Sequence, residues 1–239
     1  ASAWGERPAE RYTLVGGDLS GIQGFIYTIT SKGAAKGLRG RSFFLQLIGD
    51  AVVRRLVADL NLCWANVVYQ AGGNFMLLAP DGNMTTQVVD DVRRRVNALL
   101  MKATQADLYL VMTSRQIERA ALFDPERFLT EREQLGKQFE VIKRQPLAGL
   151  ETDWATTFEL QGRGSALSCA VCHTEVDLMT SKPLERTGEL REAADQEARI
   201  CYLCDSFGQL ASEIASDELY MAISLRPDRL QERFDPEAD

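Results

Sequence analysis

The chain has 239 residues, of which 45% are apolar and 26% are charged, and its formal net charge is −7. A chain of this length can bury a substantial core, whereas the acidic balance argues against a surface that coats nucleic acid generally. No run approaches the roughly 18 apolar residues of a membrane span, and no secretory signal is visible. We therefore expect a cytoplasmic globular protein with one domain and a smaller second one.

The chain opens with a predicted strand and two predicted helices. Residues 11–15 read as the strand. Ser20 fits a helix N-cap, and Gln23 completes a capping box ahead of an apolar helical stripe. The stretch 31–40 is rich in Gly, Lys and Arg and is expected to be a loop. A long amphipathic helix then covers about residues 43–60.

A hairpin and a further helix come next. Strands are predicted at 66–70 and 75–79, and residues 72–74 between them are of types that tolerate the positive φ of a tight turn. An amphipathic helix at 88–99 and a strand at 107–112 follow. The resulting order, β-α-β-β-α-β, is typical of ferredoxin-like domains and of polymerase palms, although this fold hosts many functions.

The second half of the chain differs from the first in composition. Residues 114–143 are expected to be helical, and the composition changes at about residue 149. We predict an α+β fold with a ferredoxin-like, nucleotidyl cyclase-like palm domain over 1–148. A small zinc-binding domain, α+β or helical, is expected over 149–239. Within it, residues 181–197 are interpreted as an insertion, and apolar positions between 207 and 219 indicate a helix.

Two pairs of cysteines carry the strongest local signal. Cys169 and Cys172 form one C-x-x-C knuckle, and Cys201 and Cys204 form another, so that four thiolates can bind one tetrahedral zinc ion. The 28 residues between the knuckles exceed the usual spacer of about 15–20, but a longer loop costs little entropy. Such a closed site is structural. Redox-active thiols and chance spacing are the alternatives, and Cys63 is expected to be a buried thiol.

Two glycine-containing motifs, at 17–21 and 72–75, suggest a nucleotide site. The first precedes a predicted helix whose N-terminus suits a phosphate, and Asp18 could reach a divalent cation bound to it. Two-metal phosphoryl transfer needs carboxylates from two sites, yet Asn74 and Phe75 occupy the second motif. We therefore expect no catalysis by this chain alone. From the residues alone, a plain helix cap and an ordinary hairpin turn remain open alternatives.

Several strings then point to a known family. The segments 17–23, 25–27, 36–43 and 72–75 together closely resemble the first palm domain of the large subunit of type III CRISPR effector complexes, over about residues 11–145. The cysteine region resembles the zinc-bearing domain of the same family. The resemblance implies two facing palms that hold two ATP molecules. It also implies an HD nuclease domain in most full-length members, and a Gly-Gly-Asp-Asp turn in the second palm, which makes cyclic oligoadenylates.

The family pattern implies a set of site residues in this chain. The chain contains no Gly-Gly-Asp-Asp turn, and its single histidine, His173, leaves it without an HD motif. It is therefore expected to be an internal piece of such a subunit or a reduced homologue. The nucleotide pocket would involve Asp18, Ser20, Gly21, Gly72, Gly73 and Asn74.

The resemblance also implies ligands and partners. We expect structural zinc, ATP with magnesium, and other subunits of a CRISPR ribonucleoprotein, with CRISPR RNA and target RNA contacted indirectly. The expected role is antiviral defence, by binding ATP for synthesis in a second palm. The alternative is a structural docking module with a vestigial pocket. Lys36, Arg39 and Arg41 could hold phosphates or RNA, or could simply anchor a solvated loop.

Overall fold

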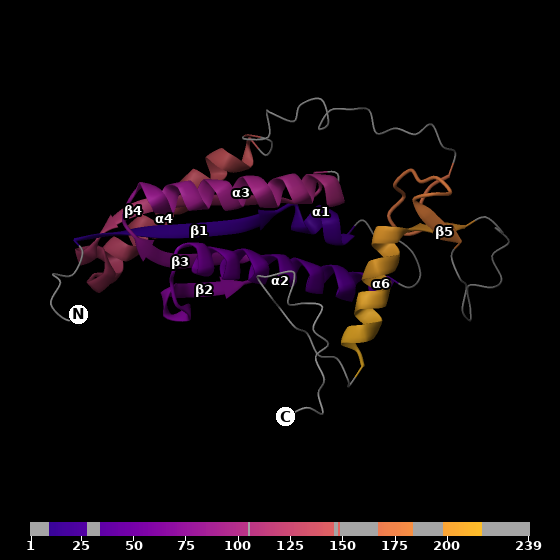
Figure 1. Ribbon diagram of the computed structural model, residues 1–239, viewed down its shortest axis with the longest axis horizontal. Helices are drawn as coiled ribbons and strands as arrows, with labels where there is room; N and C mark the ends of the chain where they lie inside the picture. Colours follow the sequence, from indigo (N-terminus) through magenta and orange to yellow (C-terminus); the bar gives the residue numbers. More distant parts are fainter. Residues whose placement is uncertain are drawn as a thin grey trace.

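The computed structural model describes residues 10–27, 34–104, 106–145, 148, 167–183 and 198–216. It is a mixed α+β structure, as predicted, built on a four-stranded antiparallel sheet (Figure 1). The strand order across the sheet is β2-β3-β1-β4. The strands are β1 (Arg11–Ser20), β2 (Val67–Ala71), β3 (Asn74–Pro80) and β4 (Tyr109–Glu118).

Helices connect these strands in the predicted order. Between β1 and β2 the chain forms α1 and α2, β2 and β3 make a hairpin, and α3 leads into β4. A fourth helix, α4, follows β4. The bounds are α1 (Ile22–Tyr27), α2 (Ala34–Asp59), α3 (Asn83–Thr104) and α4 (Pro125–Lys143), with short 3₁₀ turns at Trp64–Asn66 and Arg119–Phe123.

The two faces of the sheet carry separate apolar clusters. Because neighbouring side chains of a strand point to opposite faces, Val15 faces α2 and α3 whereas Leu14 faces α4. The larger cluster contains Leu56 of α2 and Val89 of α3, and Leu135 of α4 belongs to the smaller one. Helices therefore cover both faces, and the sheet is the middle layer.

The junction of β1 and α1 differs from the predicted capping box. Ser20 is the last residue of β1 and pairs with Tyr109, so it is not the N-cap. The carbonyl of Gly21 accepts the first helical hydrogen bond, from the Phe25 N–H at 3.0 Å. Gly21 has φ +89°, and a Cβ there would lie 1.8 Å from the carbonyl oxygen of Asp107. Close packing and backbone conformation both require glycine at this position.

The predicted loop at 31–40 is wrong over its described part, because α2 begins at Ala34. Gly40 lies inside this helix, where a Cβ would come within 2.0 Å of the carbonyl oxygen of Phe207. Phe207 belongs to α6 (Tyr202–Ile214), which packs across α2 (Figure 1). The glycine thus permits a close contact between two helices and does not interrupt the chain.

The predicted helix at 114–143 begins later than expected. Residues 114–118 continue β4, pairing along β1 as far as Arg11 opposite Glu118, and Ile117 is buried under α4. Helix α4 then starts at Pro125, where Asp124 caps it by accepting hydrogen bonds from two backbone amides. Tertiary pairing outweighs the polar composition of 114–118.

The cysteine region holds a second, two-stranded sheet. Strand β5 (Ser181–Pro183) pairs with β6 (Arg199–Cys201), which leads directly into α6. Residues 181–183 therefore belong to a strand and not to the predicted insertion. The remainder of that insertion at 184–197, Leu219, and the expected boundary between 148 and 149 lie outside the described residues or at their edge.

Candidate functional site

The end of β1 and the β2–β3 turn lie side by side, so the structure brings the two predicted motifs together. Asp18 pairs with Asn74 across the sheet, and Gly17 pairs with Phe75. The backbone N–H of Leu19 donates to the Gly73 carbonyl oxygen at 2.9 Å. Two segments more than fifty residues apart in the chain therefore form one end of the sheet.

Asp18 is held by two partners. The Asn74 amide donates from Nδ2 to Asp18 Oδ1 at 3.2 Å, and Lys143 Nζ lies 3.2 Å from Asp18 Oδ2. The Tyr69 hydroxyl donates to Asn74 Oδ1 at 2.5 Å. Desolvation opposes the charge of Lys143, but the hydrogen bond to Asp18 and its negative charge outweigh it and raise the Lys143 pKa above its usual value.

Phe75 belongs to the apolar core. It is 1% exposed, and its ring lies against Gly17, where a Cβ would come within 2.1 Å of the ring. Gly17 is therefore required by packing, and position 75 contributes no oxygen to the site. Gly72 and Gly73 have φ of +59° and +87°, the left-handed conformation that the turn requires.

A pocket of about 570 Å³ lies between α1, α2 and the hairpin. Of the six predicted nucleotide-site residues, only Gly72, Gly73 and Asn74 line it. Asp18, Ser20 and Gly21 do not line it. Asp18 is hydrogen-bonded to Asn74, but its side chain lies on the α4 face of the sheet, where it pairs with Lys143.

Sequence reasoning missed the polar wall of this pocket. Ser42, Gln46 and Asp50 of α2 line it, as does Gln70 of β2, whose side-chain amide donates to the Asp50 carboxylate. Because residues four apart share one face of a helix, the i, i+4, i+8 spacing of the three α2 residues could have indicated the wall.

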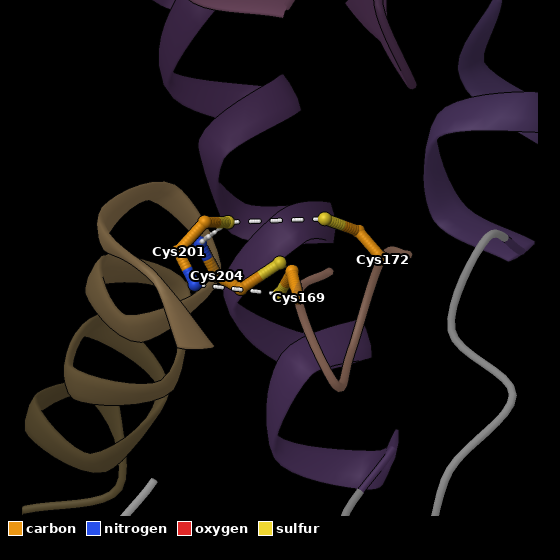
Figure 2. Close-up of side chains that lie close together, drawn as sticks. All are labelled: Cys169, Cys172, Cys201 and Cys204. Atoms are coloured by element: carbon orange, nitrogen blue, oxygen red, sulfur yellow. Dashed lines mark hydrogen bonds between the residues drawn. The ribbon is translucent and has the colours of Figure 1, made fainter. Parts of the chain in front are cut away.

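The four predicted zinc ligands do come together. Their Sγ atoms all lie within 4.8 Å of one another, and the Cys172 and Cys201 sulfurs are 3.8 Å apart (Figure 2). A tetrahedral ion with Zn–S bonds of about 2.3 Å would space its sulfurs about 3.8 Å apart. Cys169 and Cys172 come from a turn ahead of β5, and Cys201 and Cys204 from the start of α6. The donor set fits zinc.

Backbone amides support these sulfurs. The N–H groups of Val171 and Cys201 point at Cys169 Sγ from 3.4 and 3.3 Å, and the Cys204 N–H points at Cys201 Sγ from 3.4 Å. Such amides stabilise thiolates in metal sites. Cys63, in contrast, is exposed and lies outside the cluster, so its expected burial is wrong.

The proximity of the thiols makes their ionisation interdependent. Hydrogen bonds from the other three cysteines lower the pKa of Cys169, while contacts with the same neighbours raise the pKa of Cys204. Without a cation the four groups do not all ionise, because each new thiolate is repelled by the last. A bound metal ion would therefore displace protons from this cluster.

Arg41 connects the cysteine cluster to the sheet domain. It was expected to hold phosphates or RNA or to anchor a solvated loop, but it lies on α2 and is 3% exposed. Its guanidinium donates to the Phe25 carbonyl and lies 3.4 Å from Cys204 Sγ. The Phe25 and Phe207 rings flank it, with centroids at 4.9 and 5.5 Å. Lys36 and Arg39, in contrast, are exposed.

Comparison with known proteins identifies this arrangement. Residues 11–159 match the family model for Csm1 subunit domain B. This match assigns the chain, with its antiparallel α+β domain and four-cysteine cluster, to the large-subunit class of type III CRISPR effector complexes. Within that class, the chain belongs to the Csm1 family.

Two curated relatives agree with this placement. Both are described as the single-strand-specific deoxyribonuclease Cas10/Csm1 of subtype III-A. The chain is 30% identical to that of Thermococcus onnurineus over 87% of its own length and 26% of the relative. It is 27% identical to that of Methanocaldococcus jannaschii, over 90% and 27%. The chain spans about a quarter of the length of these relatives.

Solved structures of Csm1–Csm4 cassettes have a similar fold. The apo cassette matches with a TM-score of 0.55 and 31% identity, covering 63% of this chain and 21% of the other. A cassette with one ATP gives 0.54 and 33%, covering 61% and 21%, and one with cA4 gives 0.53 and 31%, covering 64% and 22%. No helix in the described part of our chain is both long and apolar enough to cross a membrane.

Proposed function

We propose that the sheet domain is a palm that binds ATP without catalysing its conversion. The observation that carries this proposal is the environment of Asp18. The pocket of about 570 Å³ adjoins a turn at which β1 supplies one carboxylate, Asp18, and this carboxylate is paired with an amide and an ammonium. Phe75 fills the next position and is buried. The site keeps room for a nucleotide and lacks the oxygens that would hold two catalytic ions.

The chemistry of the pocket suits a nucleoside. Ile22 and Ile26 of α1 supply apolar surface for a base, and the polar side chains of Gln46 and Asp50 offer hydrogen bonds to its edge or to the ribose. The turn at Gly72 and Gly73 exposes backbone beside it, and the proposed phosphate end lies toward Asp18, Ser20, Gly21 and Asn74. Magnesium would arrive as the counter-ion of ATP.

We further propose that a second palm with acidic residues completes the reaction, so that the two palms together make cyclic oligoadenylates for antiviral defence. The cassettes solved with ATP and with cA4 support this, since they are similar to our chain in sequence and fold. In this scheme our chain contributes one half-site, and the parent protein is the nucleotidyltransferase.

The remaining assignments follow from the same family. A palm over 1–148 and a zinc domain over 149–239 would dock a Csm4-type subunit and the rest of a cytoplasmic CRISPR ribonucleoprotein. CRISPR RNA and target RNA would be contacted indirectly. Zinc would be structural, since four thiolates leave no open position.

Calorimetric titration of the zinc-loaded chain with ATP and Mg²⁺ tests the proposal. We expect saturable binding to one site, and no linked products from ATP. Ser20→Asp should abolish binding, because it sets a carboxylate against the phosphates at the end of β1. Ser212→Asp, which makes the same charge change at an exposed position of α6, should leave binding intact.

Two results would contradict the proposal. Absence of ATP binding by the wild-type chain would refute the proposal that the chain forms one half of a nucleotide site. The alternative of a docking module with a vestigial pocket would then hold if the chain still bound a Csm4-type subunit. Formation of linked products by the chain alone would refute the non-catalytic role.

A further inference from the structure

The Lys143 ammonium lies 3.2 Å from the Asp18 carboxylate at the end of β1. We propose that this ammonium is a built-in cation that replaces a divalent metal at this end of the sheet. The site would then meet the phosphates of a nucleotide without a protein-bound metal of its own. The inference rests on the proposed function for its ligand, but the metal replacement itself can be tested separately.

Two elements hold the ammonium in place. Lys143 is the last residue of α4, and its carbonyl accepts a 3.0 Å hydrogen bond from the hydroxyl of Tyr109, at the start of β4. Its Nζ lies 3.2 Å from Asp18 Oδ2. Both side chains are partly buried, at 33% and 22% exposure, so solvent screens this pair less than a surface pair.

The ammonium already neutralises the one partly buried carboxylate. Asp18 brings one negative charge, Lys143 one positive charge, and Asn74 none, while the exposed Glu140 carboxylate also lies 3.3 Å from Lys143 Nζ. Mg²⁺ or Mn²⁺ would have to displace the ammonium and would then find Asp18 and the solvated Glu140. Hard divalent cations prefer several oxygen ligands, preferably charged. The arrangement therefore favours the ammonium over a metal ion.

Asn74 is fixed in the orientation that this scheme needs. Its amide nitrogen donates to Asp18, and its oxygen accepts from Tyr69. An aspartate at this position could not donate, and it would set two carboxylates at directly paired positions of β1 and β3, where like charges repel. Asn74 removes one negative charge, and Lys143 neutralises the other.

The ammonium also has a donor to offer. A lysine ammonium carries three N–H groups. In the described part of the chain it contacts Asp18, at 3.2 Å, and the exposed Glu140, at 3.3 Å. A third N–H is left for a phosphate oxygen. Asn74, which donates to Asp18, is also a lining residue of the pocket.

Manganese binding tests the replacement directly. We would titrate Mn²⁺ into the zinc-loaded chain and follow the loss of the free-ion electron paramagnetic resonance signal. Asn74→Asp alone should bind Mn²⁺ weakly, because Lys143 still occupies the position. Asn74→Asp combined with Lys143→Met should bind at least tenfold more tightly. Lys143→Gln serves as a second replacement if the methionine variant folds poorly.

Lys137→Met on the exposed side of the same helix is the matched control, and it should not change Mn²⁺ affinity in the Asn74→Asp background. Equal affinity of Asn74→Asp with and without Lys143 would overturn the proposal. So would a failure of the folded double variant to bind Mn²⁺, since no metal position would then be there to occupy.

A second measurement separates this inference from the proposed function. Omitting Mg²⁺ from the zinc-loaded chain should change the affinity of the wild type for ATP less than threefold, whereas Lys143→Met should weaken binding without Mg²⁺ at least tenfold. A stronger requirement for Mg²⁺ in the wild-type chain would contradict the built-in cation. Absence of ATP binding in all variants would refute the half-site and leave the manganese result to decide the metal replacement.

Discussion

The sheet domain and the cysteine region of this chain are stabilised in different ways. The sheet domain buries apolar side chains on both faces of its strands, in two clusters that draw on α2, α3 and α4. In the cysteine region the buried cluster consists of Cys169, Val176, Ile200 and Cys204. Two of its four buried members are proposed metal ligands. A core this small does not offset the entropy of folding, so we expect this region to depend on the proposed metal ion.

The largest expected effect comes from removing a proposed zinc ligand in the cysteine region. Cys201→Ser removes one of four ligands, and structural zinc sites of this kind contribute about 10–16 kcal/mol of binding free energy. We expect bound zinc to fall from about one equivalent to less than a tenth, measured by elemental analysis. Cys63→Ser, at the exposed fifth cysteine, should keep its zinc.

The sheet-domain signal should survive that loss. Circular dichroism of Cys201→Ser is expected to retain the helical content of α2, α3 and α4. Complete unfolding of the variant would show that the two regions form one cooperative unit and are not stabilised separately.

A substitution in the larger apolar cluster should destabilise the sheet domain instead. Leu77 is fully buried in the larger cluster, so Leu77→Ala should lower the free energy of unfolding by about 2–5 kcal/mol. Urea denaturation followed by circular dichroism measures this. Leu99→Ala, at an exposed position on α3, should cost much less. The zinc content of both variants at low denaturant should equal that of the wild type.

The pH dependence of zinc affinity should reveal the protons held by the thiols. Neighbouring thiols raise the Cys204 pKa, so the metal-free cluster retains at least one proton near neutral pH that zinc must displace. Zinc affinity should therefore rise with pH by at least about tenfold per unit, and fall as the solution is acidified. Competition with a chelator between pH 6 and 8, about the range where thiols titrate, measures it. A flat profile would mean that the metal-free thiols are already ionised.

The smallest expected effect concerns the joint between the two regions. Arg41→Met removes the group that donates to the Phe25 carbonyl and contacts Cys204 Sγ. Supporting groups of this kind change metal affinity by about 10–100-fold, and we expect the lower end here. Arg39→Met, at an exposed position two residues earlier on α2, is the control. Equal zinc affinity in both variants would leave Arg41 with a packing role only.

Local patterns sufficed where the chain's own spacing sets the geometry. Each C-x-x-C pair predicted two sulfurs close together, and the glycines of the β2–β3 turn predicted the hairpin, because both depend on neighbouring residues. That the two pairs meet follows from the need for four ligands around one ion. Gly40 misled the prediction, because its role is set by Phe207, far away in the sequence. The strand character of 114–118 likewise comes from pairing with β1, which no local propensity contains.

The candidate site follows the same division. Asp18 and Asn74 could be predicted as neighbours, because the strand order places their elements together. Lys143 could not, because its position depends on how α4 crosses the far face of the sheet. Arg41 lay in a segment that resembled a basic loop, and only the packing of α6 on α2 turns it toward Cys204.

The packing of the Phe75 ring on Gly17 restricts what these two positions can accept. An acid at position 75 would bury a charge and open a cavity over the glycine, and losing a buried Phe side chain alone costs about 3–5 kcal/mol. A larger residue at position 17 would collide with the ring. The two positions can therefore change only together, and packing opposes a carboxylate in this part of the turn.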